Sequence, residues 1–364
     1  MRIAIDCRGR AGVGRVVSNI AIGVAPRVDH LVLLGDPEQI RTWGDFSGNV
    51  EIVPFMSPVY GWQEQVRFPV SRIRFCNILH VPHFNVPFRP LKCPLVCTVN
   101  DTAHLAGILP MSVLQKAAAQ IYYRYAVHRA VHIITLSEFS RQEICNRLKV
   151  PRDRITVIHP GVDTRVFYAR RRESVQEVLS THHISEPYLL VLGSIRTHKN
   201  VGRILQAFVL LKNRDKIPHH LVIVGQRGGF RIDTRLPEIP PHIARDVIFT
   251  GTLDDEKIAA LYSGAEAFIF ASIYEGFGLP PLEAMACGTP VAVSNAASMP
   301  EAVGSAGAYF NPFDIEDIAR VVLDLIGSPE KRRRMSQQGR EWALRSTWEH
   351  AIEEHLRVYE TYAR

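Results

Sequence analysis

The 364-residue chain lacks several features that would assign it to a class at once. No stretch approaches the roughly 18 consecutive apolar residues that a membrane-spanning helix requires. Its six cysteines show no metal-ligand spacing, and thiols in a long chain are typical of the reducing cytoplasm. The first residues, Met1–Asp6, carry charge at both ends of a short strand and do not resemble a secretion signal. We therefore expect a cytoplasmic protein without disulfides.

Sequence signatures of nucleic-acid binding and of metal binding are also missing. The acids Asp254, Asp255 and Glu256 do not form a D-x-D metal motif, and acids that precede a helix usually cap it. The chain shows no short-period repeat and no low-complexity segment. We expect neither a metal centre nor a nucleic-acid partner.

The net charge of +7 is distributed unevenly. Residues 1–165 hold 20 Lys/Arg and 12 Asp/Glu, a net +8, whereas the remainder hold 23 and 24, a net −1. A basic half can favour an anionic membrane surface or a phosphorylated acceptor. An ordinary solvated surface is the alternative explanation.

Strand and helix patterns alternate along the whole chain, which predicts two doubly wound parallel sheets, an α/β architecture. A long helix is predicted over Ser112–His132, with Ile121 and Val127 on its packed face. The polar stretch Arg170–Ser185 is interpreted as a linker between the two halves. The strand candidates are Arg2–Asp6, Leu31–Leu34, Val50–Pro54, Leu79–His83, Leu95–Val99, Tyr188–Leu192, His220–Val224, Val247–Gly251 and Ala267–Ala271.

The most informative stretch is Tyr274–Val291, which reads YEGFGLPPLEAMACGTPV. It follows a short apolar run typical of a buried parallel strand. Gly276 and Gly278 allow a tight turn and close approach of a ligand. Pro280 and Pro281 suit the first turn of a helix, and Gly288 suits the position after its end. The stretch therefore predicts strand, glycine turn, helix and strand.

Two carboxylates in this stretch are separated by seven residues. Glu275 lies in the loop at the carboxyl end of the strand, where open α/β sheets bind ligands. Glu283 is expected in the first helical turn, beside free N–H groups and the positive end of the helix dipole. Carboxylates accept hydrogen bonds from sugar hydroxyls, while a helix N-terminus and glycine amides suit phosphate. The alternative is that Glu283 only complements the dipole and that Glu275 is solvated.

This stretch closely resembles the E-x7-E signature of retaining GT-B glycosyltransferases, specifically glycosyltransferase family 4. The resemblance covers nearly the whole chain. It implies a GT-B fold, with two Rossmann-like domains facing a cleft. We expect an acceptor-binding domain at residues 1–170, a nucleotide-sugar-binding domain at 186–345, and a final helix at 346–364 that crosses back to the first domain.

The resemblance also implies roles for residues in the donor half. Arg196 and Lys199 match the family's cations that hold the donor diphosphate, and two fixed cations there can neutralise a leaving group. Glu275 would orient the sugar and Glu283 would bind the ribose hydroxyls. The remaining implied donor contacts are Gly276, Phe277, Gly278 and Leu279 of the signature and Thr252 and Leu253, which resemble the segment that frames the base.

In the first half, Gly12 and Gly14 belong to a glycine-rich loop, Arg8–Arg15. Taken alone, this loop is weak evidence of phosphate binding, because a turn that requires positive φ explains the glycines equally well. In the family a loop ending in Gly-Arg stands here and faces the donor phosphate. Asn100 stands where the family usually has His. Asn keeps hydrogen bonding but cannot relay a proton near neutral pH.

The resemblance implies a retaining hexosyltransferase of the bacterial branch that builds surface polysaccharide such as lipopolysaccharide. The donor would be a GDP-sugar, carrying mannose or a deoxyhexose such as rhamnose, and no metal cofactor would be required. The acceptor would be a saccharide or a polyprenyl-diphosphate-linked saccharide, with peripheral contact to the inner face of an anionic membrane. The alternatives are a catalytically silent GT-B scaffold or binding subunit, and a sugar-nucleotide epimerase or phosphorylase on the same fold.

Overall fold

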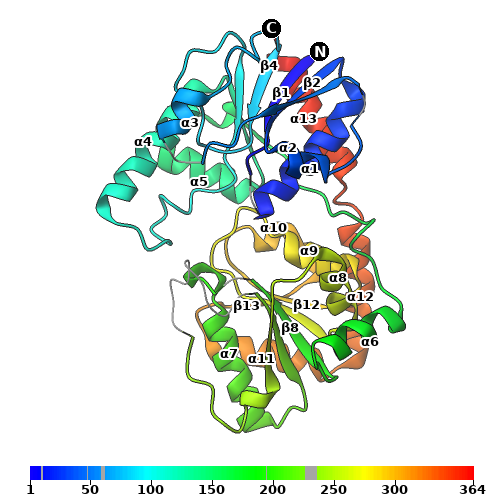
Figure 1. Ribbon diagram of the computed structural model, residues 1–364. Helices are drawn as coiled ribbons and strands as arrows, with labels where there is room; N and C mark the ends of the chain where they lie inside the picture. The colour runs from blue at the N-terminus through cyan, green and yellow to red at the C-terminus, as the bar shows by residue number, and fades with distance from the viewer. Residues whose placement is uncertain (10, 47, 59–61, 194, 226–235) are drawn as a thin grey trace. The chain divides into compact units, whose positions relative to one another are not determined.

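The computed structural model describes residues 1–364 except 10, 47, 59–61, 194 and 226–235 (Figure 1). The chain divides into two compact units. The first unit consists of Met1–Gly107, Met111–Gly161 and Trp348–Arg364, and the second of Ile108–Pro110 and Val162–Thr347. Each unit contains one parallel sheet with helices packed against it, which confirms the predicted pair of α/β sheets.

The sheet of the first unit has seven parallel strands in the order β3-β2-β1-β4-β5-β6-β7. The strands are β1 (Arg2–Asp6), β2 (His30–Gly35), β3 (Val50–Pro54), β4 (Ile78–Val81), β5 (Leu95–Thr98), β6 (His132–Thr135) and β7 (Ile155–Val157). The helices are α1 (Ala11–Val24), α2 (Pro37–Arg41), α3 (Trp62–Arg67), α4 (Val113–Arg129), α5 (Glu138–Leu148) and α13 (Trp348–Tyr362). Because β2 lies on one side of β1 and β4 on the other, the chain reverses its direction of sheet growth between β1 and β4.

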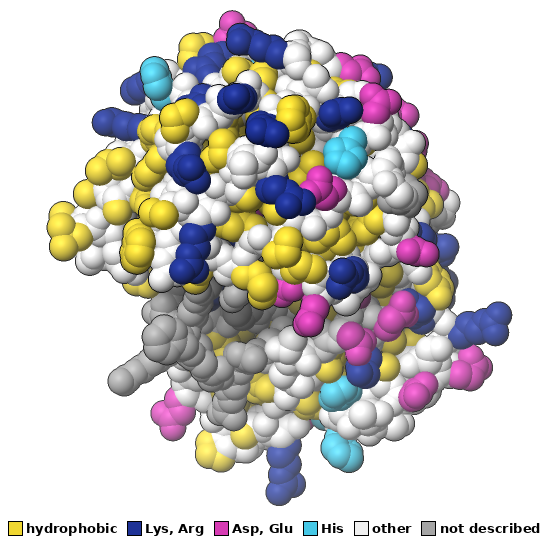
Figure 2. Space-filling view, turned by 45° about the horizontal axis from the view of Figure 1, so that its top comes forward, with side chains coloured by type: hydrophobic (Ala, Val, Ile, Leu, Met, Phe, Trp, Pro, Cys, Tyr) yellow, Lys and Arg dark blue, Asp and Glu magenta, His cyan; other side chains and the backbone are white. Residues whose placement is uncertain are grey.

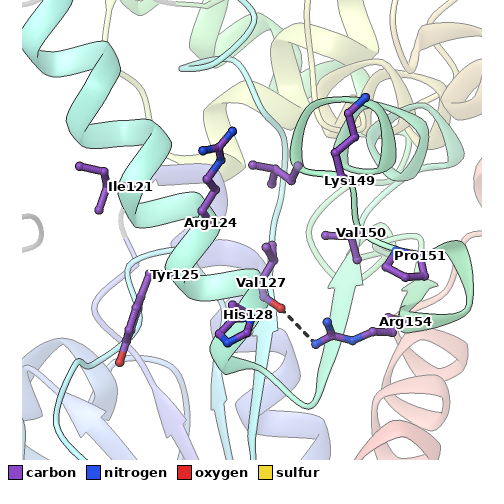
Figure 3. A pocket seen from close by; sticks show the side chains of 10 residues that line it. Ile121, Arg124, Tyr125, Val127, His128, Lys149, Val150, Pro151 and Arg154 are labelled. Atoms are coloured by element: carbon purple, nitrogen blue, oxygen red, sulfur yellow. Dashed lines mark hydrogen bonds between the residues drawn. The ribbon is translucent and has the colours of Figure 1, made fainter.

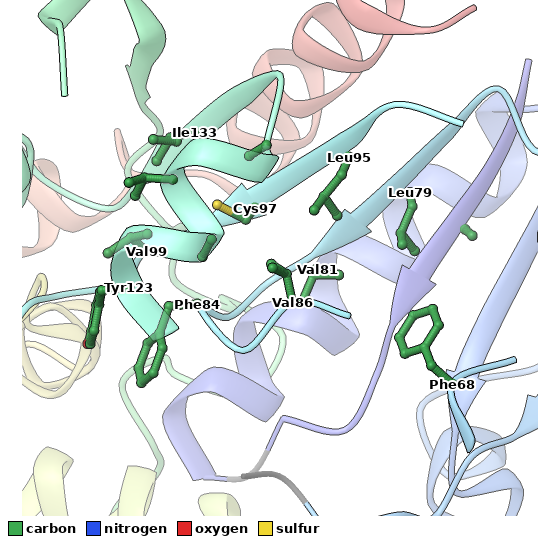
Figure 4. Packing of buried hydrophobic residues seen from close by; sticks show 14 of the residues in the cluster. Phe68, Leu79, Val81, Phe84, Val86, Leu95, Cys97, Val99, Tyr123 and Ile133 are labelled. Carbon is green, nitrogen blue, oxygen red and sulfur yellow. The ribbon is translucent and has the colours of Figure 1, made fainter. Parts of the chain in front are cut away.

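The central strands of this sheet are apolar on both faces because helices cover both sides. Figure 4 shows Leu79 and Val81 of β4 and Leu95 and Cys97 of β5 within one apolar cluster. Tyr123 of α4 joins this cluster, with its ring stacked at 3.8 Å on Phe84. Burying a side chain of this size contributes about 1.5–3 kcal/mol, so the cluster holds α4 firmly against the sheet.

Helix α13 belongs to the first unit although it ends the chain. Figure 1 shows it beside α1. The hydroxyl of Tyr359 is 2.7 Å from Nδ1 of the buried His80 on β4. A Cβ at Gly23 of α1 would lie 1.9 Å from Cδ1 of Ile352, so only glycine allows the two helices to pack this closely. The last residues therefore complete the core of the first unit.

The sheet of the second unit has six parallel strands in the order β10-β9-β8-β11-β12-β13. The strands are β8 (Tyr188–Leu192), β9 (His220–Val224), β10 (Val247–Gly251), β11 (Ala267–Phe270), β12 (Val291–Ser294) and β13 (Ala308–Phe310). The helices are α6 (Arg172–Thr181), α7 (Val201–Leu210), α8 (Asp255–Gly264), α9 (Leu279–Ala286), α10 (Met299–Val303), α11 (Ile315–Ile326) and α12 (Pro329–Ala343). Here the reversal falls between β8 and β11, and open α/β sheets bind ligands at such a point.

Two local predictions were wrong. The interpretation of Arg170–Ser185 as a linker fails because most of it forms α6, which buries Val175 and Leu179 and packs on α8. Its spacing of apolar side chains is helical, and its many charges obscured this. Ile121 of α4 was expected to pack, yet its side chain is 65% exposed. The buried face of α4 consists of Ala119, Tyr123, Ala126 and Val127.

Candidate functional site

The strongest candidate site of the second unit is the loop that follows β11. Ser298 holds this loop, because its hydroxyl donates to the carbonyls of Glu275 at 2.9 Å and Phe277 at 2.5 Å. Gly278 has φ +128°, and a Cβ there would lie 2.4 Å from Cε of Met299. Glycine is therefore required at this position on both conformational and steric grounds. The loop is held by internal contacts, so Glu275 occupies a defined place in it.

Glu275 forms an ion pair with Lys199. Nζ of Lys199 lies 2.5 Å from Oε1 of Glu275, and the two side chains are 21% and 19% exposed. The ammonium also lies 5.3 Å from the centroid of the Phe270 ring at the end of β11. A backbone hydrogen bond of 2.8 Å from Ile273 to His198 joins the two loops. Since β8 and β11 are neighbouring strands, this pair lies at the point where the sheet reverses its growth.

Arg196 lies in the same loop after β8, just before the 3₁₀ turn Thr197–Lys199. Its side chain is half-buried and makes no hydrogen bond or ion pair to any residue that the structure describes. Gly193 directly follows β8 with φ +151°, and a Cβ there would lie 3.7 Å from Cδ of Lys199. The loop therefore presents one cation paired with a carboxylate and a second cation without a charged partner among the described residues.

Helix α9 places Glu283 differently from the prediction. The helix begins at Leu279, with Pro280 and Pro281 in its first turn as predicted, and Gly288 has φ +84° after its end. Glu283 is the fifth helical residue, so the expectation that it lies in the first turn was wrong, since the free N–H groups belong to the first four. Its side chain is 2% exposed. A carboxylate buried to this extent requires polar partners.

Thr252 and Leu253 lie between β10 and α8. Thr252 is exposed and Leu253 is half-buried. Asp254 caps α8, with its carboxylate accepting from the N–H of Lys257 at 2.9 Å, as expected for acids before a helix. Within the described part of the chain, no group of three or more His, Cys, Asp or Glu side chains could hold a metal ion.

These segments line one edge of the second sheet, because all its strands are parallel and each segment follows a strand end. β10 and β11 are three strand spacings apart, or roughly 14 Å. An extended ligand along this edge would meet Thr252 and Leu253 first, then the cations after β8, and then Glu275. A molecule with an anionic centre and hydroxyl groups at one end matches that order of side chains.

Gly12 and Gly14 lie in the first turns of α1 and not in a loop, so the explanation by positive φ was wrong. A Cβ at Gly14 would lie 2.9 Å from the carbonyl oxygen of Gly9, which gives Gly14 a packing reason. A Cβ at Gly12 would meet nothing within 4 Å. No contact within the described chain requires glycine at position 12.

Asn100 follows β5 and is half-buried. Its side-chain amide donates to the carbonyl of Pro82 at 3.3 Å, and its own carbonyl accepts from the hydroxyl of Ser140 at 3.1 Å. His83 follows the neighbouring strand β4, and burial lowers the pKa of its imidazole to about 4. His83 is therefore a neutral hydrogen-bonding group at pH 7 beside Asn100 on the same sheet edge. Sequence reasoning passed over it, although its place just after a buried strand was a usable signal.

A buried charged network after β1 was also missed. Nη2 of Arg8 lies 2.5 Å from Oδ2 of Asp6 and 2.6 Å from Oε1 of Glu64 on α3. The guanidinium lies 3.9 Å from the centroid of the Phe55 ring. Burial raises the pKa of Glu64 against the opposing effect of Arg8. This network ties α3 to the end of β1, and nothing in the sequence pairs residues so far apart.

Comparison with known proteins covers nearly the whole chain. The profile of Glycosyltransferase Family 4 matches residues 11–166, and that of Glycosyl transferases group 1 matches residues 180–342. The O-antigen chain mannosyltransferase B of Escherichia coli is 30% identical over 289 residues, which cover 78% of this chain and 74% of that protein. The serotype-specific mannosyltransferase WbdA of Escherichia coli is 34% identical over 197 residues, 53% of this chain but only 24% of that longer protein.

The fold has matches among solved structures. The crystal structure of Anabaena HepE in complex with UDP-glucose has a TM-score of 0.75 at 17% identity, covering 98% of this chain and 100% of that one. This likeness shows the fold. Together with the two profiles and the mannosyltransferase relative, it places the chain in the GT-B glycosyltransferases of family 4 type.

Proposed function

We propose that this protein is a retaining glycosyltransferase that moves mannose, or a deoxyhexose such as rhamnose, from a GDP-sugar to a saccharide or polyprenyl-diphosphate-linked saccharide during synthesis of a bacterial surface polysaccharide. Members of its family use nucleotide-sugar donors. Its relatives named as O-antigen mannosyltransferases support the sugar and the setting. The residues of the second unit support the donor chemistry.

The observation that carries the proposal is the Lys199–Glu275 pair where the second sheet reverses its growth. A Lys ammonium has three donors. One is directed at Glu275, which leaves two for the oxygens of the donor diphosphate. Arg196, in the same loop, supplies the second positive charge and can bind two phosphate oxygens at once. The two cations would stabilise the charge that develops on the leaving group.

The other proposed contacts follow from their places along the sheet edge. Glu275, with the backbone of Gly276–Leu279, would orient the sugar, and Glu283 would accept hydrogen bonds from the ribose. Thr252 and Leu253 would frame the base. In the first unit, Gly12 and Gly14 would allow phosphate to approach the start of α1, and Asn100 would donate a hydrogen bond to the sugar.

In the reaction, the bond from the anomeric carbon to the leaving phosphate oxygen breaks and the acceptor oxygen forms the new bond on the same face of the sugar. The acceptor proton passes to an oxygen of the departing diphosphate. No protein base is needed at Asn100, which can only share hydrogen bonds. Arg196 and Lys199 supply the positive charge, so we propose that the reaction does not depend on a divalent metal.

The test is to incubate the purified protein with a GDP-sugar and simple mannosides, and to identify both products. Release of GDP with transfer or hydrolysis of the sugar supports the proposal, and full activity in a chelator supports the metal-independent scheme. An isomerised nucleotide sugar would instead indicate an epimerase, and a strict need for phosphate a phosphorylase. Lys199→Ala and Glu283→Ala proteins with normal kinetics would refute the assigned site.

A further inference from the structure

The positive charge of the chain is concentrated in one segment of the first unit. Residues 65–137 hold eight Lys/Arg and one acid, Asp101, so this segment alone has a net charge of +7, equal to that of the whole chain. Within the described residues, Arg72 is the one of these eight that forms an ion pair, with Glu51. The other seven form no ion pair with a described residue, although the guanidinium of Arg89 donates to the backbone carbonyls of Val66 and Phe68.

The same part of the chain exposes most of the large hydrophobic side chains. Of the twelve that are exposed among the described residues, nine lie between Met56 and Val131. Trp62 is 74% exposed, Leu114 82% and Ile121 65%. Single exposed apolar side chains need no explanation, but a concentration of them marks an interaction surface.

These side chains belong to neighbouring elements. Phe88 joins α3 to α4, since its N–H donates to the side chain of Gln65 at 2.7 Å and its ring contacts those of Tyr122 at 5.5 Å and Tyr125 at 4.6 Å. We define the α3–α4 face as the exposed apolar residues Trp62, Val66, Phe88, Leu114 and Ile121 with the exposed basic residues Arg67, Arg89, Lys116 and Arg124. Figure 2 shows hydrophobic and Lys/Arg side chains interspersed on the surface of this part of the chain.

Helix α4 carries apolar side chains on its exposed side as well as on its buried side, and Lys116 and Arg124 lie among the exposed ones. One side packs on the sheet through Tyr123, Ala126 and Val127, while Leu114 and Ile121 project from the other. The outer side of α4 therefore has the composition of a surface that meets a partner, and its partner must also tolerate many positive charges.

An open groove of about 690 Å³ adjoins this face, between α4 and the residues that follow α5. Figure 3 shows Arg124 near Ile121 and Tyr125 on α4, and Lys149 on the other side of the groove. Arg154 is engaged, because its guanidinium donates to the backbone carbonyls of Val127 and Ala130. None of the described residues that line the groove is acidic. Its positive lining beside an apolar rim suits a phosphate headgroup.

We propose that the α3–α4 face docks on a bilayer that contains anionic phospholipid. Trp62, Leu114 and Ile121 enter the headgroup region, where Trp and aliphatic side chains are favoured. Lys116, Arg124 and the other basic residues of the face pair with lipid phosphates. The role of this contact rests on the proposed function, since it brings the enzyme to a polyprenyl-diphosphate-linked acceptor. Its existence does not depend on the acceptor.

The test is co-sedimentation of the full chain with vesicles of phosphatidylcholine alone or mixed with phosphatidylglycerol. Binding is expected only to the mixed vesicles and should weaken in 1 M salt, where charges are screened beyond about 3 Å. Lys116→Glu/Arg124→Glu should lower the partition coefficient about 30-fold or more, since each basic residue near such a surface contributes about fivefold. Leu114→Ser/Ile121→Ser should lower it about tenfold for each side chain.

The matched controls carry the same changes on the second unit. Arg333 and Arg334 of α12 are exposed, and Leu344 is 56% exposed. Arg333→Glu/Arg334→Glu and Leu344→Ser should bind vesicles like the wild type. Equal losses in controls and test variants would overturn the assigned face. Absent binding of the wild type at low salt, or tighter binding to an RNA oligonucleotide than to the vesicles, would overturn the membrane partner.

The proposed function and the proposed docking face can be refuted independently of each other. A thermal shift with nucleotide sugars reports on the donor site, and the vesicle variants should retain it because their changed residues lie outside the second unit. Vesicle binding without any nucleotide-sugar shift would leave the docking face standing and remove the proposed function. A nucleotide-sugar shift without vesicle binding would do the opposite. Unchanged melting temperatures of the variants establish that their fold is intact.

Discussion

Lys199 and Glu275 should act as one unit in both stability and turnover. The pair joins the loops after β8 and β11 at 2.5 Å, with about a fifth of each side chain exposed. Exposed ion pairs contribute about 0.2–1 kcal/mol, and breaking a fully buried pair costs about 3–5 kcal/mol. The intermediate exposure of this pair predicts a coupling of about 1–2 kcal/mol to the free energy of unfolding.

The expected effect on turnover is larger. Lys199→Ala removes a positive charge directed at the leaving group, and loss of one such preorganised donor lowers kcat by about 10²–10³-fold. Glu275→Ala removes the partner that fixes the ammonium, so it should lower kcat in the wild-type background. In the Lys199→Ala background the same change should cost at least about fivefold less, because no ammonium remains to be held.

The assay is a double-mutant cycle that measures chemical unfolding and nucleotide release with the donor sugar. The ion pair of Lys331 with Asp324 serves as control, because its side chains are 28% and 58% exposed and lie away from the sheet edge. Its cycle should show at most about 1 kcal/mol of coupling in stability and none in kcat. Additive effects of Lys199→Ala and Glu275→Ala on kcat, within about 0.5 kcal/mol, would refute the pairing as a functional unit.

Three further predictions concern single residues. Glu283→Gln should raise the donor KM about tenfold or more with little change in kcat, because the lost hydrogen bonds stabilise the bound donor and the transition state equally. Unchanged donor affinity would remove Glu283 from the site. Gly278→Ala should destabilise the second unit by about 1–3 kcal/mol, because φ is +128° and the new Cβ would meet Met299, and Gly278→Ala/Met299→Ala should recover only the steric part in an unfolding titration. Burial lowers the pKa of His355 to about 4, whereas the ordinary pKa of histidine is near 6.5, so below pH 6.5 the unfolded chain binds more protons than the folded one. The contribution of His355 to the free energy of unfolding should be full above pH 6.5 and fall by about 3 kcal/mol as the pH drops to 4. His355→Gln should reduce this pH dependence in unfolding titrations.

The sheet and its edge could be predicted because short apolar runs and turn residues mark parallel strands directly. The carboxyl ends of β8, β10 and β11 carry the polar residues that the pattern singled out. In a parallel sheet, a residue that follows the carboxyl end of a strand lies at the same edge of the sheet as the residues that follow the other strands. The prediction of Lys199 and Glu275 as site residues rested on this property and on the resemblance.

The pairings could not be predicted, because they depend on which strands become neighbours. Lys199 and Glu275 were assigned to phosphate and sugar separately, yet they contact each other because β8 lies beside β11. The place of Glu283 within α9 was also misjudged. The helix begins at Leu279, so Glu283 is its fifth residue, and its side chain is buried. A carboxylate expected beside the free N–H groups of the first turn therefore needs other polar partners.

The outer surface of α4 was the least predictable feature. Ile121 was assigned to the packed face of this helix together with Val127, yet its side chain is 65% exposed. Periodicity alone cannot separate a side that meets the sheet from one that meets a partner. The exposed fractions of Leu114 and Ile121, together with the surrounding positive charge, make that distinction.

The most direct test of the central claim is a thermal-shift panel of the purified protein with GDP-, UDP-, ADP- and dTDP-sugars, run for the wild type and for Lys199→Ala. A ligand that binds only the native state adds about 2.7 kcal/mol at 100 times its Kd. We predict a clear shift of the wild type with the GDP-sugar and a reduced shift of the variant at the same concentration. A clear shift with another nucleotide alone would contradict the proposed GDP donor, and no shift with any of the four would contradict the assignment of the second unit as a donor site.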